Sequence, residues 1–177
     1  MGTGQMLLTI GAIVLLGSII VTTNRGINNS SQVVMTTAMG IDAVSLATST
    51  IEKAQESAFD RATMDSTWTV STSKLASPSI LGKRSATDTI GDYYDQFNGW
   101  GPNGPGPTSC LLDSDSLATG WYMVKTQVHY VTRNYLTGKV DTTTASATWS
   151  KQLDVWVWNK ADTVDKVHMI DVFSYWY

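Results

Sequence analysis

An uncharged apolar stretch near the N-terminus, residues 6–21, constrains this chain more than any other feature. It reads MLLTIGAIVLLGSIIV and holds no charge and no proline. Its length falls between the core of a signal peptide and the roughly 20 residues of a membrane span. No basic residue precedes it, and the residues after it make a poor cleavage site, so we expect a retained apolar helix. Such a helix must be buried in a bilayer, a micelle or copies of itself.

The bulky apolar side chains of this stretch are the predicted packing residues of an assembly core. They are Met6, Leu7, Leu8, Ile10, Ile13, Val14, Leu15, Leu16, Ile19, Ile20 and Val21. Each gains roughly 1.5–3 kcal/mol on burial, so the set without Met6 gains on the order of 15–30 kcal/mol as an upper value. Gly11 and Gly17 would let neighbouring helices approach closely.

The composition after this stretch is that of one polar globular domain. The net charge is −3, which argues against a nucleic-acid partner, because such proteins carry a basic face. Only 15% of the residues are charged, and serine and threonine supply much of the polarity, which favours an extracellular surface. Cys110 is the only cysteine, so no disulfide within the chain can form.

Helical spacing marks residues 32–60 as an amphipathic helix. One apolar stripe recurs at intervals of three and four residues and predicts the face that packs on a sheet. We assign to this helix-to-sheet core the residues Ile41, Val44, Ala47, Ile51 and Ala58.

A segment of weak helix formers, residues 22–31, separates the two helical parts. Asn24, Gly26, Asn28 and Asn29 cost about 0.5–1 kcal/mol each relative to alanine in a helix. We therefore predict a bend or an extended junction there, which divides the chain into an assembly helix at 1–31 and a globular domain at 32–177. The alternative is one continuous helix of roughly 55 residues, far longer than the average.

The rest of the chain predicts an irregular region at 63–119 and an antiparallel sheet at 120–177. Glycine and proline crowd residues 97–107, which indicates a long surface loop. Apolar and polar residues then alternate, with turn signals at 134–138 and 159–162. The predicted fold is α+β, a long helix on an antiparallel meander. Trp100 on the loop, with Trp156 and Trp158 on the outer face of the sheet, are candidates for contact with another molecule.

Motifs that carry enzyme or metal chemistry are missing from the sequence. There is no phosphate-binding loop, CxxC pair or HExxH motif, and His129 and His168 lie in strand patterns, so we expect no enzyme and no cofactor. The acids Asp92, Asp95, Asp113 and Asp115 could supply oxygen ligands to Ca²⁺, but the spacing of a calcium loop is lacking. We expect them to be solvated loop acids.

This order of elements resembles that of type IV pilins and pseudopilins: a long N-terminal helix, apolar and then amphipathic, then a loop and an antiparallel sheet. If Met1 leads the mature chain, Gln5 stands where pilins place a glutamate that registers one subunit on the next. Glutamine keeps the size and loses the charge. If processing follows Gly4, as prepilin peptidases cut after glycine, Thr9 takes that fifth place instead.

The resemblance implies a structural subunit of an extracellular helical filament on a prokaryotic cell, polymerised through its apolar helices. Its partners would be copies of itself, the inner membrane before assembly, and a pilus-type assembly machinery. The alternative is a membrane-anchored pseudopilin or binding module of a secretion system that forms no long filaments. Arg25 alone would place the domain in the cytoplasm by the positive-inside rule. We give more weight to the weakly charged, serine- and threonine-rich surface, which favours the outside.

Overall fold

A computed structural model describes residues 2–64, 71–82, 92–98, 113–134, 136–142, 146–161 and 165–175. The chain divides into two compact units, Met1–Gly40 and Ile41–Tyr177. The first unit is helical and belongs to the N-terminal part of α1 (Thr3–Gln55). The second unit contains the last part of α1 and the sheet, and the two units are described separately below.

The helix α1 contains no break at the predicted junction. Residues 22–31, including Asn24, Gly26, Asn28 and Asn29, are α-helical throughout, so the predicted bend is wrong. Each weak helix former there costs at most about 1 kcal/mol, and none is a proline that would remove a hydrogen bond. Extending an existing helix is far easier than starting a new one, so strong helical sequence on both sides carries the helix through.

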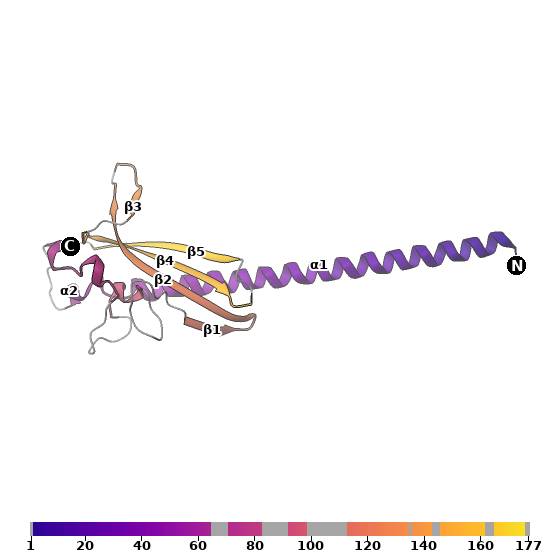
Figure 1. The fold of residues 1–177 in the computed structure, drawn as a ribbon, viewed down its shortest axis with the longest axis horizontal. Helices are drawn as coiled ribbons and strands as arrows, with labels where there is room; N and C mark the ends of the chain where they lie inside the picture. Colours follow the sequence, from indigo (N-terminus) through magenta and orange to yellow (C-terminus); the bar gives the residue numbers. More distant parts are fainter. Residues whose placement is uncertain are drawn as a thin grey trace. The chain divides into compact units, whose positions relative to one another are not determined.

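The second unit is built on an antiparallel sheet, which confirms the predicted α+β fold. Figure 1 shows its main strands side by side in the order β1, β2, β4, β5, and the short β3 pairs with the far end of β2. The strands are β1 (Asp113–Leu117), β2 (Gly120–Arg133), β3 (Val140–Thr142), β4 (Ser150–Asn159) and β5 (Lys166–Ser174).

Two differences separate this sheet from the predicted one. Strand β1 lies in the region predicted to be irregular, because its polar sequence DSDSL has no apolar alternation. It forms as the first arm of a hairpin, in which Leu117 pairs with Gly120. Residues 140–158 were expected to be one strand, but they form the separate strands β3 and β4. The turn between β2 and β3 is where it was predicted, with Gly138 at φ +68° and its N–H donating to Asn134 O at 2.8 Å.

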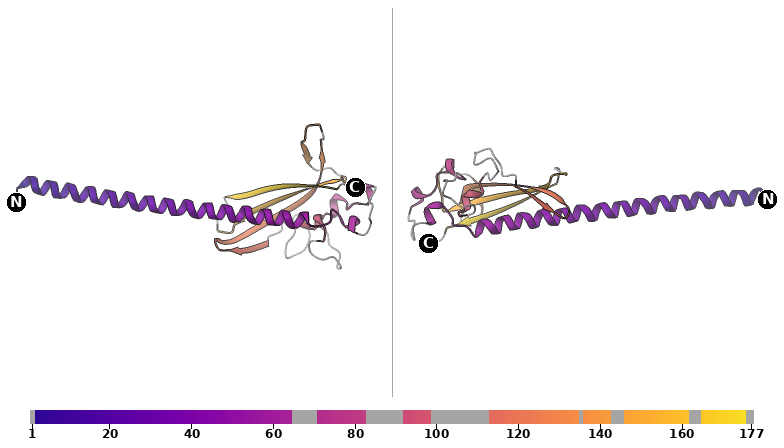
Figure 2. Two further views of the ribbon diagram at one scale, coloured as in Figure 1. Left: turned by 180° about the vertical axis from the view of Figure 1, so that it is seen from behind. Right: turned by 90° about the horizontal axis from the view of Figure 1, so that it is seen from below.

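The core of the second unit lies between one face of the sheet and the end of α1 (Figure 2). The buried helix residues are Ala43, Ala47 and Ala54. They pack against alternate side chains of the two central strands, which are Tyr122, Val124, Val128, Leu153, Val155 and Val157. All three helix residues are small, which lets the helix lie close to the sheet.

The predicted helix-to-sheet residues are only partly correct. Ala47 is buried, and Ile51 is half-buried against the core. Ile41 and Val44 are 65% and 45% exposed, and Ala58 lies beyond the helix end in a bridge to Tyr93. The true stripe runs through the alanines, which hydrophobicity ranks below isoleucine and valine, so the predicted face is rotated from the observed one.

Short helices close one end of this unit. They are α2 (Arg61–Met64), η1 (Thr72–Lys74), η2 (Pro78–Ile80) and η3 (Tyr94–Phe97). Asn98 follows η3, and its Oδ1 accepts a hydrogen bond from the backbone N–H of Val128 at 2.9 Å. Its backbone oxygen also lies beside Gly82, at φ +82°, where a Cβ would clash with that oxygen. Trp100 and the rest of the glycine- and proline-rich loop lie outside the described residues.

Candidate assembly surface

The apolar side chains of residues 6–21 are all exposed in the single chain. The exposure of the predicted packing residues runs from 51% at Val21 to 77% at Leu8. Beyond them, the apolar surface continues along α1 with Ile27, Val33, Val34 and Met35, each more than half exposed. Monomeric soluble proteins rarely expose a contiguous apolar surface this long, so this part of α1 needs an apolar environment.

The apolar residues surround the helix rather than forming one stripe. Consecutive residues turn by about 100°, so Ile13, Val14, Leu15 and Leu16 alone point in four directions around the axis. A helix that is apolar on all sides belongs in a membrane or in the centre of a larger assembly. By length and composition, α1 contains a segment that could cross a membrane.

The hydroxyl groups in this part of α1 are satisfied by the helix itself. Thr9 Oγ1 donates to Gln5 O at 2.7 Å, Ser18 Oγ to Leu15 O at 2.8 Å, and Thr22 Oγ1 to Ser18 O at 2.8 Å. These bonds need neither water nor a partner chain. The segment can therefore enter an apolar environment without leaving those three donors unpaired.

Small residues mark one side of the same segment. Gly4, Gly11 and Ser18 are spaced by seven residues, or close to two helical turns, so they lie nearly in line along the helix. A Cβ added at Gly4, Gly11 or Gly17 would have no neighbour within 4 Å. The helix surface is thus thinnest along this line, where another helix could approach most closely.

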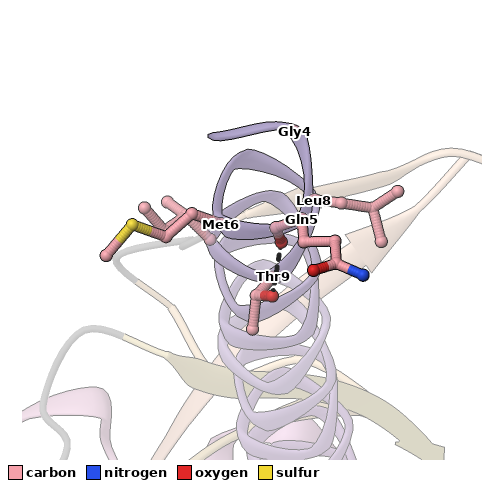
Figure 3. A pocket seen from close by; sticks show the side chains of 6 residues that line it. Gly4, Gln5, Met6, Leu8 and Thr9 are labelled. Carbon is pink, nitrogen blue, oxygen red and sulfur yellow. Dashed lines mark hydrogen bonds between the residues drawn. The ribbon is translucent and has the colours of Figure 1, made fainter. Parts of the chain in front are cut away.

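The first turns of α1 carry the predicted registration residue. Gln5 lies beside Gly4, Met6, Leu8, Thr9 and Ile10 around an open hollow at the helix surface. Figure 3 shows the Gln5 and Leu8 side chains on one side of the helix and Met6 on the other, with the Gln5 carboxamide directed away from the axis. Only the backbone oxygen of Gln5 is engaged by Thr9, so the carboxamide faces outward. Its role in registration stays a prediction.

The outer face of the sheet carries the predicted contact residues Trp156 and Trp158. Both are half-buried because cationic side chains of the neighbouring strands cover them. Lys125 Nζ lies 4.8 Å from the ring centroid of Trp156, and Lys166 Nζ lies 5.1 Å from that of Trp158. The His168 ring stacks on Trp156 at 4.7 Å, with 4° between the planes. Each ring thus already has a partner within the chain, whereas Trp100 lies outside the described residues.

An acid between two histidines lies on the same face. Asp154 Oδ1 is 2.8 Å from His168 Nε2, and Asp154 Oδ2 is 3.5 Å from His129 Nδ1. Gln152 Nε2 donates a hydrogen bond to Asp154 Oδ2 at 3.1 Å. His129 is therefore not a freely solvated strand residue, because it packs at a buried carboxylate. Within the described ranges, no group of three or more histidine, cysteine or acidic residues is arranged to hold a metal ion.

The acids that could have supplied oxygen ligands to Ca²⁺ are not all solvated loop residues, as had been expected. Asp95 is 2% exposed and its Oδ1 lies 3.4 Å from Lys151 Nζ, so it is not the solvated loop acid that was expected. Asp113 and Asp115 lie on β1, not in a loop. The burial of Lys151 was not predicted from the sequence. The signal was present, because Lys151 is in phase with the core residues Leu153, Val155 and Val157 of β4.

Comparisons with protein families, with curated proteins and with solved structures find no match to this chain. What the structure shows is a long N-terminal helix, apolar in its first part, that packs on an antiparallel sheet with its last part. That arrangement is compatible with the pilin-like order of elements.

Proposed function

We propose that this chain is a structural subunit of an extracellular helical filament of the type IV pilus kind. Residues 6–21 would form the filament core together with the same residues of neighbouring copies, and the sheet domain would face outward. Before assembly the same helix would hold the chain in the inner membrane of a prokaryotic cell, and a pilus-type machinery would extract it. The role is mechanical, without an enzymatic reaction on a substrate.

One observation carries this proposal: an apolar surface that surrounds a helix and belongs to the same helix that packs on the sheet. The exposed residues between Met6 and Val21 could not remain in water, since each gains about 1.5–3 kcal/mol on burial. The line through Gly4, Gly11 and Ser18 supports packing between identical helices, because it allows their backbones to approach. Gln5 would take part in registration through hydrogen bonds rather than through charge.

A matched pair of leucine substitutions tests the proposal in cells that naturally produce the chain. Leu16→Glu places a charge in the apolar segment, and Leu136→Glu places the same charge on the hairpin between β2 and β3, where Leu136 is 98% exposed. A charged side chain in an apolar core costs about 3 kcal/mol. We expect filaments of the unchanged chain by electron microscopy, none from Leu16→Glu, and filaments at near-normal yield from Leu136→Glu.

The alternative function gives a different result. A membrane-anchored pseudopilin or binding module would leave the unchanged chain in the membrane fraction, and detergent would release it as monodisperse particles without filaments. That outcome would refute the filament proposal and favour the membrane-anchored module. Equal loss of filaments in both variants would show that residue 16 has no special place in the assembly.

A further inference from the structure

The end of the second unit contains a lysine that is fully enclosed. Lys151 lies on β4 and is 0% exposed, with its side chain on the core side of the sheet. Removing an ammonium group from water costs several kcal/mol unless partners compensate for it. The rings of Phe59 and Tyr130 lie near it, with Nζ 4.5 Å and 5.3 Å from their centroids. The lysine is therefore held in a dry aromatic pocket.

Two carboxyl groups face the Lys151 ammonium. Lys151 Nζ lies 2.8 Å from Asp60 Oδ2 and 3.4 Å from Asp95 Oδ1, and it donates to Phe59 O at 2.8 Å. Asp60 and Asp95 are 1% and 2% exposed, so water screens neither of them. If all three groups are ionised, the pocket holds an uncompensated negative charge. The two carboxyl groups must therefore differ in protonation.

The hydrogen bonds show which carboxyl differs. Asp60 Oδ1 accepts from Ala62 N at 3.0 Å, and Asp60 Oδ2 accepts from Ala76 N at 3.1 Å in addition to Lys151. Tyr130 directs its hydroxyl to Ala76 O at 2.6 Å and to Asp60 Oδ2 at 3.4 Å. Burial, and then the nearby Asp60 charge, raise the pKa of Tyr130, so it remains a donor. Both oxygens of Asp60 therefore accept hydrogen bonds within the pocket.

Asp95 has the opposite environment. Its Oδ1 is buried and accepts no hydrogen bond, although it faces the lysine. Burial, opposed by the Lys151 charge and reinforced by Asp60, raises the pKa of Asp95 to about 6. The pocket thus brings together an amine, a hydrogen-bonded carboxylate and a carboxyl group that readily holds a proton. These are the three components of an intramolecular condensation.

We propose that Lys151 Nζ and the side chain of Asp95 condense into an amide inside the folded chain, which links β4 covalently to η3. The Asp60 carboxylate takes a proton from the Lys151 ammonium. The Nζ lone pair then forms a bond to Cγ of protonated Asp95, and the bond from Cγ to the hydroxyl oxygen breaks. That oxygen leaves as water with the second amine proton, and Asp60 retains the first proton or passes it to solvent.

No other reactant is needed, because the chain supplies the nucleophile, the base and the electrophile. The reaction replaces a buried ammonium and a buried carboxyl group with one neutral amide, and the pocket then holds no charge while Asp60 retains the proton. Proximity favours the step, because the groups are held within contact distance in a site without water. The proposal does not depend on filament formation.

Peptide mass spectrometry of the full chain tests the cross-link directly. Trypsin should leave one species that joins residues 85–125 to residues 140–160, because it cannot cut after a linked Lys151. The mass of this species should be one water below the summed masses of the two peptides. Recovery of 85–125 and 140–151 as separate peptides, with no joined species, would overturn the proposal. A joined species that contains residues 54–61 instead would show that Asp60, not Asp95, had reacted.

Three variants separate the roles in the pocket. Lys151→Arg keeps the charge without a nucleophilic amine, and Asp60→Asn removes the base, so both should lose the joined species. Lys125→Arg on the outer face should keep it. Because the unchanged chain already decides the main point, a variant that fails to fold does not weaken the test. A joined species in Lys151→Arg would contradict the assignment.

The pH dependence of the reaction tests the role of Asp95 as the acid. Its raised pKa means that it holds a proton below about pH 6 and loses the proton as the pH rises above that value. Between pH 6 and pH 8 the protonated fraction falls about 50-fold. When the chain is produced unfolded and unlinked and is then refolded, the joined species should form more slowly at pH 8 than at pH 6 by a factor approaching that fall. An equal or faster rate at pH 8 would overturn this mechanism.

Discussion

Lys151 shows how one residue governs the end of the domain. Its ammonium is the cation that faces both Asp60 and Asp95 in the buried pocket. Asp60 in turn accepts from the N–H of Ala62 at the start of α2 and from Ala76 between η1 and η2. The lysine thus ties the sheet to the short helices that cover its end. Without it, two carboxyl groups would be left buried and without their cation.

A lysine-to-alanine pair measures this effect. Lys151→Ala should lower the free energy of unfolding of the detergent-solubilised chain by at least about 3–5 kcal/mol, because it removes the buried partner of Asp60 and, with it, the proposed link to Asp95. Lys125→Ala on the outer face, which removes a partly exposed contact with Trp156, should cost no more than about 1 kcal/mol. Urea denaturation followed by tryptophan fluorescence gives both values. Similar losses in the two variants would mean that the buried pocket contributes little.

At the scale of elements, the helix α1 packs through its small residues. Ala43, Ala47 and Ala54 are at most 5% exposed, whereas Val44 beside them is 45% exposed. The close approach of helix and sheet leaves no room for larger side chains at the alanine positions. The polar contacts lie at the edges of this interface, where Gln55 Nε2 donates to Asp171 Oδ1 at 2.9 Å and Tyr94 donates to Asp171 Oδ2 at 3.1 Å.

Two substitutions to leucine test which face of α1 is buried. Ala47→Leu should overpack the core and lower the free energy of unfolding by about 1–3 kcal/mol. Val44→Leu enlarges an exposed side chain and should change the free energy of unfolding by less than about 0.5 kcal/mol. The comparison uses the same denaturation assay. If Val44→Leu proved the more harmful of the two, Val44 rather than Ala47 would be the residue packed against the sheet.

The elements could be predicted from the sequence to different degrees. Apolar composition revealed the helix of residues 6–21, and strict alternation revealed β2 and β5, because both signals are local. The path of α1 through Gly26 was missed, since individual helix propensities are weaker than the cooperativity of a long helix. Strand β1 was missed because its pairing with β2, not its own pattern, makes it a strand. Alternation along β4 places Lys151 on the core side of the sheet, but its partners Asp60 and Asp95 lie more than 50 positions away, and no local pattern reveals that pairing.

At the scale of the whole molecule, the two units differ in what stabilises them. The unit Ile41–Tyr177 contains both buried apolar clusters, and its sheet is complete without the first unit. Residues 6–21 have no buried side chain in the single chain. The first unit therefore depends on its surroundings, whereas the second unit has a core of its own.

A truncation tests this independence. A chain that begins at residue 36 keeps all of the second unit and lacks the exposed apolar residues between positions 6 and 35. We expect it to be soluble without detergent, monomeric by gel filtration, and to unfold cooperatively, with a far-ultraviolet circular dichroism spectrum that shows both helix and sheet. The full chain should need detergent under the same conditions. Aggregation of the truncated chain would mean that the remaining apolar surface of α1 also requires cover.

The hydroxyl bonds of Thr9, Ser18 and Thr22 have a consequence for the direction of assembly. Each donates to a carbonyl of its own helix, so the segment offers these donors to no specific neighbour. Lipid tails and copies of the same helix would then be nearly equivalent surroundings, and exchange between them would meet little polar resistance either way. In the proposed filament, polymerisation would be intrinsically reversible. Whether the polymer grows or retracts would be decided by the sign of the work that its machinery supplies.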